Sequence, residues 1–178
     1  THPHHPAYLE THSALAEYDA SGSMSVWLTT QSVFKVQEVI GKLLDMPLSR
    51  IRVIGSTVGG GFGGKKPRVE HYAAAMAYKA RKPVRITLSR EEDMETTFQR
   101  HPSIVDIKSG VKKDGTITAH HQDIVFNSGA YAGLMPLGYL AGTDRIAANF
   151  HIANARFDHR QVYTNNVPAG HMRAPAKP

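Results

Sequence analysis

The sequence predicts an α+β fold, in which a mixed or antiparallel sheet with hairpins packs against two or three helices. Three observations predict it: short strand-like segments joined by turn residues, two segments whose apolar residues recur at helical spacing, and the lack of any internal repeat. With 178 residues, of which 41% are hydrophobic, the chain is long enough for about one domain with a real core.

The first elements are expected to be a hairpin and a helix. Residues 12–18 and 24–29 are typical of strands, and residues 19–22 (Asp-Ala-Ser-Gly) between them are typical of a turn. Apolar residues at helical spacing predict a helix over 33–44, with Ser32 as its N-cap. Pro47 marks its end, because the residue before a proline avoids helical backbone.

A strand over 51–58, a glycine-rich loop and a helix over 67–81 are expected next. Val69, Tyr72, Ala73, Met76, Ala77 and Ala80 form the apolar face of that helix. A short buried strand over 84–88 follows, and residues 103–111 and 116–126 form a second hairpin around an Asp-Gly turn. The order of polar and apolar residues along 116–126 does not show which face of this strand is buried. An irregular loop and a short helix over 129–150, then a strand over 161–163, complete the expected elements.

Composition excludes several classes of function. The net charge of +6 is scattered and not interleaved with aromatic residues, so no nucleic-acid partner is expected. Without cysteine the chain carries no disulfide and no iron–sulfur cluster. No apolar run approaches the roughly 20 residues of a membrane span, and the sequence shows no signal-peptide pattern. A cytoplasmic location is expected. The adjacent His120 and His121 point to opposite faces of a strand, and no metal-ligand spacing occurs, so no metal site is predicted.

The loop Gly59–Lys65 contains five glycines around one phenylalanine. Each glycine inside a helix or strand costs about 0.5–1 kcal/mol relative to alanine, so such a run persists where the backbone must approach another group closely. A strand before the loop and a helix start after it predict a site for an anionic cofactor, since helix N-termini offer N–H groups. Phe62 is expected either to anchor the loop in a core or to press on a planar group.

Two phosphate-binding patterns match this loop by letter but lack their context. The P-loop needs Ser or Thr after its lysine, and Lys66 stands there. A dinucleotide site needs an acidic residue about 20 positions on, and Glu91 and Glu92 lie too far along. A phosphate-binding glycine-loop module and a purely structural glycine loop stay open as alternatives.

The order of its motifs makes the chain similar to the molybdenum-cofactor-binding large subunit of the xanthine dehydrogenase/aldehyde oxidase family. The markers are residues 8–11 (Tyr-Leu-Glu-Thr) as an entry strand, Thr30-Gln31, the loop 59–65, residues 89–94, residues 100–102, residues 127–131, Thr164-Asn165 and residues 172–175 (Met-Arg-Ala-Pro). The resemblance implies that residues 1–178 form part of a larger molybdopterin-binding domain, as a fragment of a longer subunit.

The resemblance also implies cofactor-binding residues for molybdopterin with molybdenum, which bacterial members can carry as a cytosine dinucleotide. The amide of Gln31 would donate to an oxygen on molybdenum, although it could instead only satisfy backbone at the helix start. The backbone of Gly61, Phe62 and Gly63 would lie against the metal's oxo group. Arg173 would contribute to the cofactor and substrate neighbourhood, the alternative being a surface charge.

Departures from the family's patterns bear on the substrate. Purine-oxidising members carry Glu directly after the loop lysine, where this chain has Lys66. Those members close with Arg-Gly-Phe-Gly, whereas Arg173 is followed by Ala-Pro-Ala. Carbon monoxide oxidisers have a cysteine after that arginine, where Ala174 stands. Lys66 and Arg173 are therefore the expected substrate residues, and N-heterocycles or aldehydes the expected substrates.

No catalytic residue is expected within this chain. The family's general-base glutamate lies in a Gly-x-Gly-Glu segment far downstream, so this piece alone is expected to be inactive. Glu91, Glu92 and Glu95 are interpreted as solvated helix-start or loop charges. The implied partners are iron–sulfur and flavin subunits or domains of the same complex, together with the remaining part of the large subunit.

Two interpretations from different classes follow. The first is the cofactor-binding portion of a molybdenum hydroxylase, which oxidises N-heterocycles or aldehydes with water-derived oxygen. The second is a truncated, non-catalytic structural or interaction domain.

Overall fold

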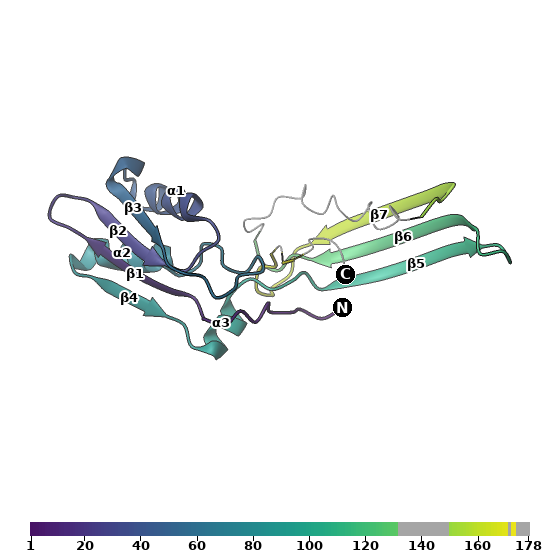
Figure 1. Cartoon of the computed structure of the whole chain (residues 1–178), viewed down its shortest axis with the longest axis horizontal. Helices are drawn as coiled ribbons and strands as arrows, with labels where there is room; N and C mark the ends of the chain where they lie inside the picture. Colours follow the sequence, from purple (N-terminus) through teal and green to yellow (C-terminus); the bar gives the residue numbers. More distant parts are fainter. Residues whose placement is uncertain (132–149, 171, 174–178) are drawn as a thin grey trace. The chain divides into compact units, whose positions relative to one another are not determined.

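The computed structural model describes residues 1–131, 150–170, 172 and 173, and the chain divides into two compact units. Residues Pro6–Thr97 form the first, called here the N-terminal unit. Thr1–His5 together with Phe98–Pro178 form the second, called the C-terminal unit. The predicted α+β class is confirmed, because helices and mixed sheets are both present (Figure 1).

A four-stranded mixed sheet forms the centre of the N-terminal unit. Its strands are β1 (Ser13–Tyr18), β2 (Met24–Leu28), β3 (Ile51–Gly55) and β4 (Val84–Thr87), in the order β3-β2-β1-β4. β1 pairs antiparallel with both β2 and β4, and β3 runs parallel to β2. The predicted first hairpin is confirmed, with Asp19 accepting the turn hydrogen bond from Gly22.

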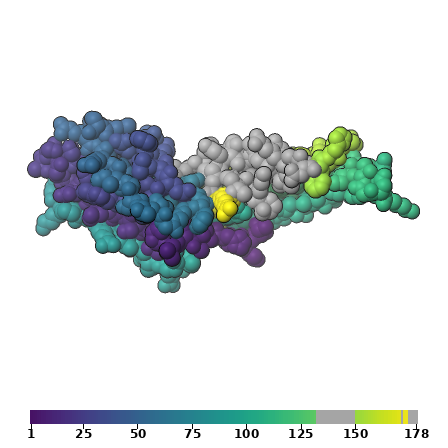
Figure 2. Space-filling view, viewed as in Figure 1, coloured from purple at the N-terminus to yellow at the C-terminus, as the bar shows by residue number. Residues whose placement is uncertain are grey.

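Two helices, α1 (Val33–Leu44) and α2 (Glu70–Ala80), pack on this sheet and close one core (Figure 1). The core consists of alternate strand residues and the inner faces of the helices: Ala14, Ala16, Met24, Val26, Leu28, Val36, Ile40, Ile51, Val69, Ala73, Ala74 and Ala77. The space-filling view shows the residues of this unit, purple to teal, as one closely packed body (Figure 2). Burial of this apolar surface is the main force that holds the helices on the sheet.

The buried face of α2 differs from the predicted one. Ala73, Ala74 and Ala77 are fully buried, whereas Tyr72 and Met76 are more than half exposed. Three alanines on one side let the helix axis approach the strands closely, and a larger side chain would hold it away. The predicted face is confirmed at Val69, Ala73 and Ala77 and wrong at Tyr72 and Met76, whose large side chains do not suit this close approach.

The helix α3 (Arg90–Thr96) was not predicted as an element. Ser89 accepts a hydrogen bond from the backbone N–H of Glu92, and the Glu92 carboxylate accepts one from the backbone N–H of Ser89. This reciprocal capping box has the sequence Ser-x-x-Glu, a signal for a helix start that could have been read. Glu91 and Glu92 are exposed in the first turn, as the interpretation of these residues as helix-start charges expects.

A buried polar cluster ties α3 to the segment before β1. Asp93 Oδ1 lies 2.6 Å from His12 Nδ1 and accepts the backbone N–H of His12 at 3.1 Å. Tyr8 Oη lies 2.9 Å from the same Nδ1 and 3.4 Å from Thr97 Oγ1. Burial raises the pKa of Tyr8 well above its ordinary value, so its hydroxyl stays neutral.

This cluster predicts a loss of stability in acid. Burial alone would raise the pKa of Asp93, but hydrogen bonds from the ring and backbone of His12 outweigh it and hold the pKa below its ordinary value. A carboxyl whose pKa is lowered by folding contributes stability above its unfolded pKa of about 4, and this is lost as the pH falls through the folded value. Urea titrations should therefore give Asp93→Asn a stability deficit that is largest at neutral pH and shrinks below about pH 4. A deficit that stays constant with pH would contradict this assignment.

The C-terminal unit contains a three-stranded sheet. Its strands β5 (Ser103–Val111), β6 (Ile117–Asn127) and β7 (Asn154–Val162) lie in the order β5-β6-β7, antiparallel and then parallel. The second predicted hairpin is confirmed, and β7 is longer than the predicted strand over 161–163. Most of the loop and short helix expected over 129–150 lies outside the described residues.

The two faces of β6 are now distinguished. Gln122, Ile124 and Phe126 are buried on one face. On the other face His121 Nε2 lies 2.8 Å from Asp158 Oδ2, and Asp123 accepts a hydrogen bond from Arg160 at 2.5 Å. Charged cross-strand pairs mark that second face as the polar one. The sequence left this choice open because both faces mix polar and apolar residues.

Candidate functional site

Gln31 lies against the glycine loop. It stands between the end of β2 and the start of α1, and its side-chain Oε1 accepts hydrogen bonds from the backbone N–H of Gly63 at 3.0 Å and of Lys65 at 3.2 Å. Its own backbone N–H donates to the carbonyl of Lys65 at 3.0 Å. Two motifs that were identified separately in the sequence are thus joined by three hydrogen bonds.

These contacts decide how the amide of Gln31 is oriented. Only its oxygen can accept, so the two backbone donors fix Oε1 toward the loop and turn the Nε2 amino group away from it. Within the described part of the chain Nε2 has no hydrogen-bond partner, and the residue is exposed. Gln31 therefore presents a fixed, neutral donor beside the loop.

The loop backbone adds further donors. The amides of Gly63, Gly64 and Lys65 are used within the site, the second by the carbonyl of Gly61 at 2.7 Å. The N–H groups of Gly60, Gly61 and Phe62 make no hydrogen bond to any described residue. Successive unpaired N–H groups in a glycine-rich bend form a concave surface with positive partial charge, which suits an electron-rich oxygen.

The tip of the loop is strained and exposed. Phe62 has a φ of 50°, in the left-handed region that a bulky residue rarely adopts. Its neighbour Gly63 has a φ of 93°. The Phe62 side chain is 47% exposed, which contradicts the first of the two alternatives left open for it, an anchor in a core. Backbone in such a conformation costs about 1–3 kcal/mol and persists where the surroundings hold it in place.

Three glycines of the loop leave room for other side chains of the protein. A Cβ at Gly61 would lie 2.5 Å from Gln31 Oε1, and one at Gly64 would lie 2.6 Å from Tyr8 Cε1. A Cβ at Gly59 would overlap the carboxylate of Glu10. The close approach that the sequence predicts is thus made, at these three glycines, to the chain's own side chains.

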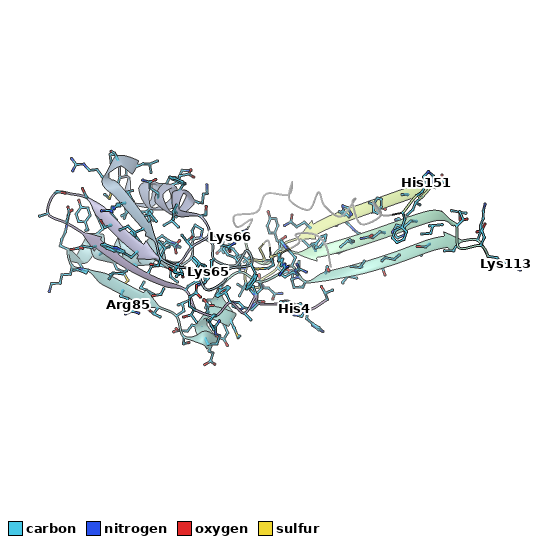
Figure 3. All side chains as sticks on the ribbon, viewed as in Figure 1. His4, Lys65, Lys66, Arg85, Lys113 and His151 are labelled. Carbon is cyan, nitrogen blue, oxygen red and sulfur yellow. The ribbon has the colours of Figure 1, made fainter. Side chains whose placement is uncertain are left out.

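Lys65 is a buried structural residue. Its Nζ donates to Glu10 Oε1 at 2.7 Å and to Thr29 Oγ1 at 3.0 Å, and lies 4.7 Å from the centroid of the Tyr8 ring. Its side chain is 0% exposed (Lys65 and its neighbour Lys66 are labelled in Figure 3). A P-loop lysine must reach a bound phosphate, and this one cannot. The geometry therefore gives no support to a phosphate-binding module.

At the start of α2, where an anionic cofactor was expected, a carboxylate of the chain itself accepts backbone N–H groups. The carboxylate of Glu70 accepts hydrogen bonds from the backbone N–H of Arg68 and of Val69, both at 3.0 Å, and this residue is 1% exposed. A buried carboxylate at this end repels a second negative charge. The donors that remain are those of the loop itself and of Gln31.

The two residues predicted to meet substrate lie in different units. Lys66 directly follows the loop, is half-buried, and donates its backbone N–H to the carbonyl of Gly64 at 2.9 Å. Burial lowers the pKa of Lys66 below its ordinary value. Arg173 is exposed in the C-terminal unit, where its carbonyl accepts a hydrogen bond from the guanidinium of Arg100. Their roles toward a substrate stay predictions.

Comparisons with known proteins identify the family. The family model for the molybdopterin cofactor-binding domain matches residues 1–178. A probable xanthine dehydrogenase component of Bacillus subtilis is 34% identical over 93% of this chain and 22% of the relative. The nicotinate dehydrogenase large molybdopterin subunit of Eubacterium barkeri is 33% identical over 93% of this chain and 39% of the relative. The chain thus spans less than two fifths of the length of these relatives.

Among solved structures, the aldehyde oxidoreductase of Desulfovibrio gigas superposes with a TM-score of 0.88, at 25% identity, over 98% of this chain and 19% of that one.

No helix among the described residues is long and apolar enough to cross a membrane. Those residues also hold no group of three or more His, Asp or Glu side chains placed to bind a metal ion.

Proposed function

Because the chain belongs to the molybdopterin cofactor-binding domain family, we propose that it forms the cofactor-binding portion of a molybdenum hydroxylase that oxidises N-heterocycles or aldehydes. One observation carries this proposal: Gln31 is bonded to the glycine loop through its oxygen, and its amino group and the consecutive amides of Gly60, Gly61 and Phe62 have no hydrogen-bond partner among the described residues. All four are neutral donors, and none competes as a ligand for a metal.

The donor set fits a molybdenum cofactor. Its oxygen atoms accept hydrogen bonds, which the loop and Gln31 can donate, and the carboxylate of Glu10 beside the loop is neutralised by the ammonium of Lys65. Gln31, Gly61 and Phe62 would hold the cofactor. Gly63 contributes the bend, since its own N–H is already bonded to Gln31. When bound, the cofactor supplies two-electron oxidation with oxygen derived from water.

The proposal also covers the substrate class, the form of the cofactor and the partners. Lys66 stands where purine oxidisers carry glutamate, and this favours aldehydes or N-heterocycles over xanthine, with Arg173 as a second contact. Relatives named for nicotinate and for aldehydes support this class. We expect the cofactor as molybdopterin, in a bacterial host as its cytosine dinucleotide, together with iron–sulfur and flavin partners and the rest of the large subunit, in the cytoplasm.

Metal and pterin analysis of the protein tests the proposal. Purified with its co-purifying subunits from a host that makes the molybdenum cofactor, the protein should contain about one molybdenum per chain and an equal amount of fluorescent pterin. The same protein from a host unable to make the cofactor is the control and should contain neither. A folded protein free of both after expression in the competent host would contradict the proposal and favour a non-catalytic structural domain.

A further inference from the structure

The segment just before β1 has a different role from the one the resemblance implied. Residues 8–11 were expected to be an entry strand, but β1 begins at Ser13 and these residues belong to no strand. Tyr8 and Glu10 contact the glycine loop, whereas the intervening Leu9 is 83% exposed. The segment therefore presents every second side chain to the loop.

Glu10 binds both ends of that loop with one oxygen. Its Oε1 accepts the backbone N–H of Gly59 at 3.0 Å, at the start of the loop, and the Nζ of Lys65 at 2.7 Å, at its end. The residues between these two anchors include the three unpaired amides. A single carboxylate thus closes the loop that carries the donors.

The second anchor depends on the charge of Glu10. The ammonium of Lys65 has no solvent exposure, and its other contacts are a neutral hydroxyl of Thr29 and the ring of Tyr8. A buried cation needs a counter-charge close by. Burial alone would raise the pKa of Glu10, but hydrogen bonds from Lys65 and Gly59 outweigh it and hold the pKa below its ordinary value. Glu10 is therefore ionised at neutral pH.

Tyr8 packs against the same loop. A Cβ at Gly64 would lie only 2.6 Å from Cε1 of the Tyr8 ring, and a Cβ at Gly60 would lie 3.5 Å from the Tyr8 Cβ. Its hydroxyl lies against His12 and Thr97, within the buried cluster around Asp93. Tyr8 is thus tied to the end of α3. Because Glu10 lies only two residues further along the chain, its distance from the loop is also fixed.

We propose that Glu10 is a positioning residue, which acts through Gly59 and Lys65 to set the conformation of the donor amides of Gly60, Gly61 and Phe62. The proposal depends on the proposed function only for the identity of the ligand. The conformation of the loop can be measured without any cofactor, so failure of one proposal is distinguishable from failure of the other.

Glu10→Gln is the decisive variant. The amide keeps an acceptor for Gly59 but cannot neutralise the ammonium of Lys65, so the loop end should be released. In the whole chain, hydrogen exchange at the amides of Gly63 and Lys65, both bonded to Gln31, should accelerate at least about tenfold relative to the amides of the core helix α2.

Glu38→Gln is the matched control, because it removes an exposed glutamate–lysine pair of α1, with Lys35 at 2.9 Å, that makes no contact with Glu10 or Lys65. It should leave exchange at Gly63 and Lys65 unchanged. Uniform acceleration in Glu10→Gln at these amides and in α2 would mean a general stabilising role and would overturn the proposal, as would no change. If Glu10→Gln does not fold, Glu10→Asp takes its place, because it keeps the charge but is one methylene shorter. The measured quantity is again the exchange rate at Gly63 and Lys65 relative to that in α2.

Discussion

Gly61→Ala is expected to weaken cofactor binding by at least about tenfold, which corresponds to about 1.4 kcal/mol of binding free energy, and so to lower the molybdenum content. A Cβ at this position would lie 2.5 Å from Oε1 and 2.6 Å from Cδ of Gln31, so the side chain must leave its place. Two hydrogen bonds to the loop are then lost, and the Nε2 donor turns away from the site. Molybdenum per chain, after purification from the competent host, measures the effect.

Two further variants test whether the loss of molybdenum comes from displacement of Gln31. Gly55→Ala at the end of β3 adds a Cβ 3.2 Å from a Val33 methyl carbon, which needs to shift by only a few tenths of an ångström, and should keep its molybdenum. The double variant Gly61→Ala/Gln31→Ala removes the steric overlap. It should regain thermal stability but not molybdenum. Full occupancy in the double variant would show that Gln31 is no ligand of the cofactor.

Glu10→Ala is expected to destabilise the fold more than Lys65→Met does. Removal of Glu10 leaves a fully buried ammonium without a counter-charge, and the loss of one partner of a buried pair costs about 3–5 kcal/mol. Removal of Lys65 leaves a carboxylate that is 32% exposed and can be hydrated, so the loss should be nearer about 1–2 kcal/mol. Urea unfolding at neutral pH measures both.

The double variant Glu10→Ala/Lys65→Met closes the cycle. Because no buried charge then remains, it should be more stable than Glu10→Ala alone. If the two single variants lose equal stability and their effects simply add, the two side chains do not act as a buried pair. In that case the account of the loop anchors is wrong.

Much of the fold was readable in the sequence because periodicity and turn chemistry agreed. The helix over 33–44 and both hairpins are where these patterns place them. The inner face of α2 was misread, since Tyr72 and Met76 are apolar yet too large for the close approach that the alanines allow. The helix α3 was missed although its capping box was visible, because its charged residues resembled a solvated loop.

The contact between Gln31 and the glycine loop was predictable, but the geometry around the loop was not. The family resemblance placed Gln31 and the loop in one candidate site, and the structure joins them by hydrogen bonds. No pattern in the sequence shows that Glu10 and Lys65 meet across 55 positions, or that the glycines make room for Gln31 and Tyr8. Those contacts depend on the packing of segments distant in the chain, which local spacing does not encode.

An experimental structure of the cofactor-loaded protein tests the central claim most directly. The measured quantities are the distances from Gln31 Nε2 and from the Phe62 amide nitrogen to the nearest cofactor oxygen. We expect both to be hydrogen bonds of about 2.7–3.2 Å. A cofactor bound elsewhere, with these two donors facing water or other protein groups, would contradict the account.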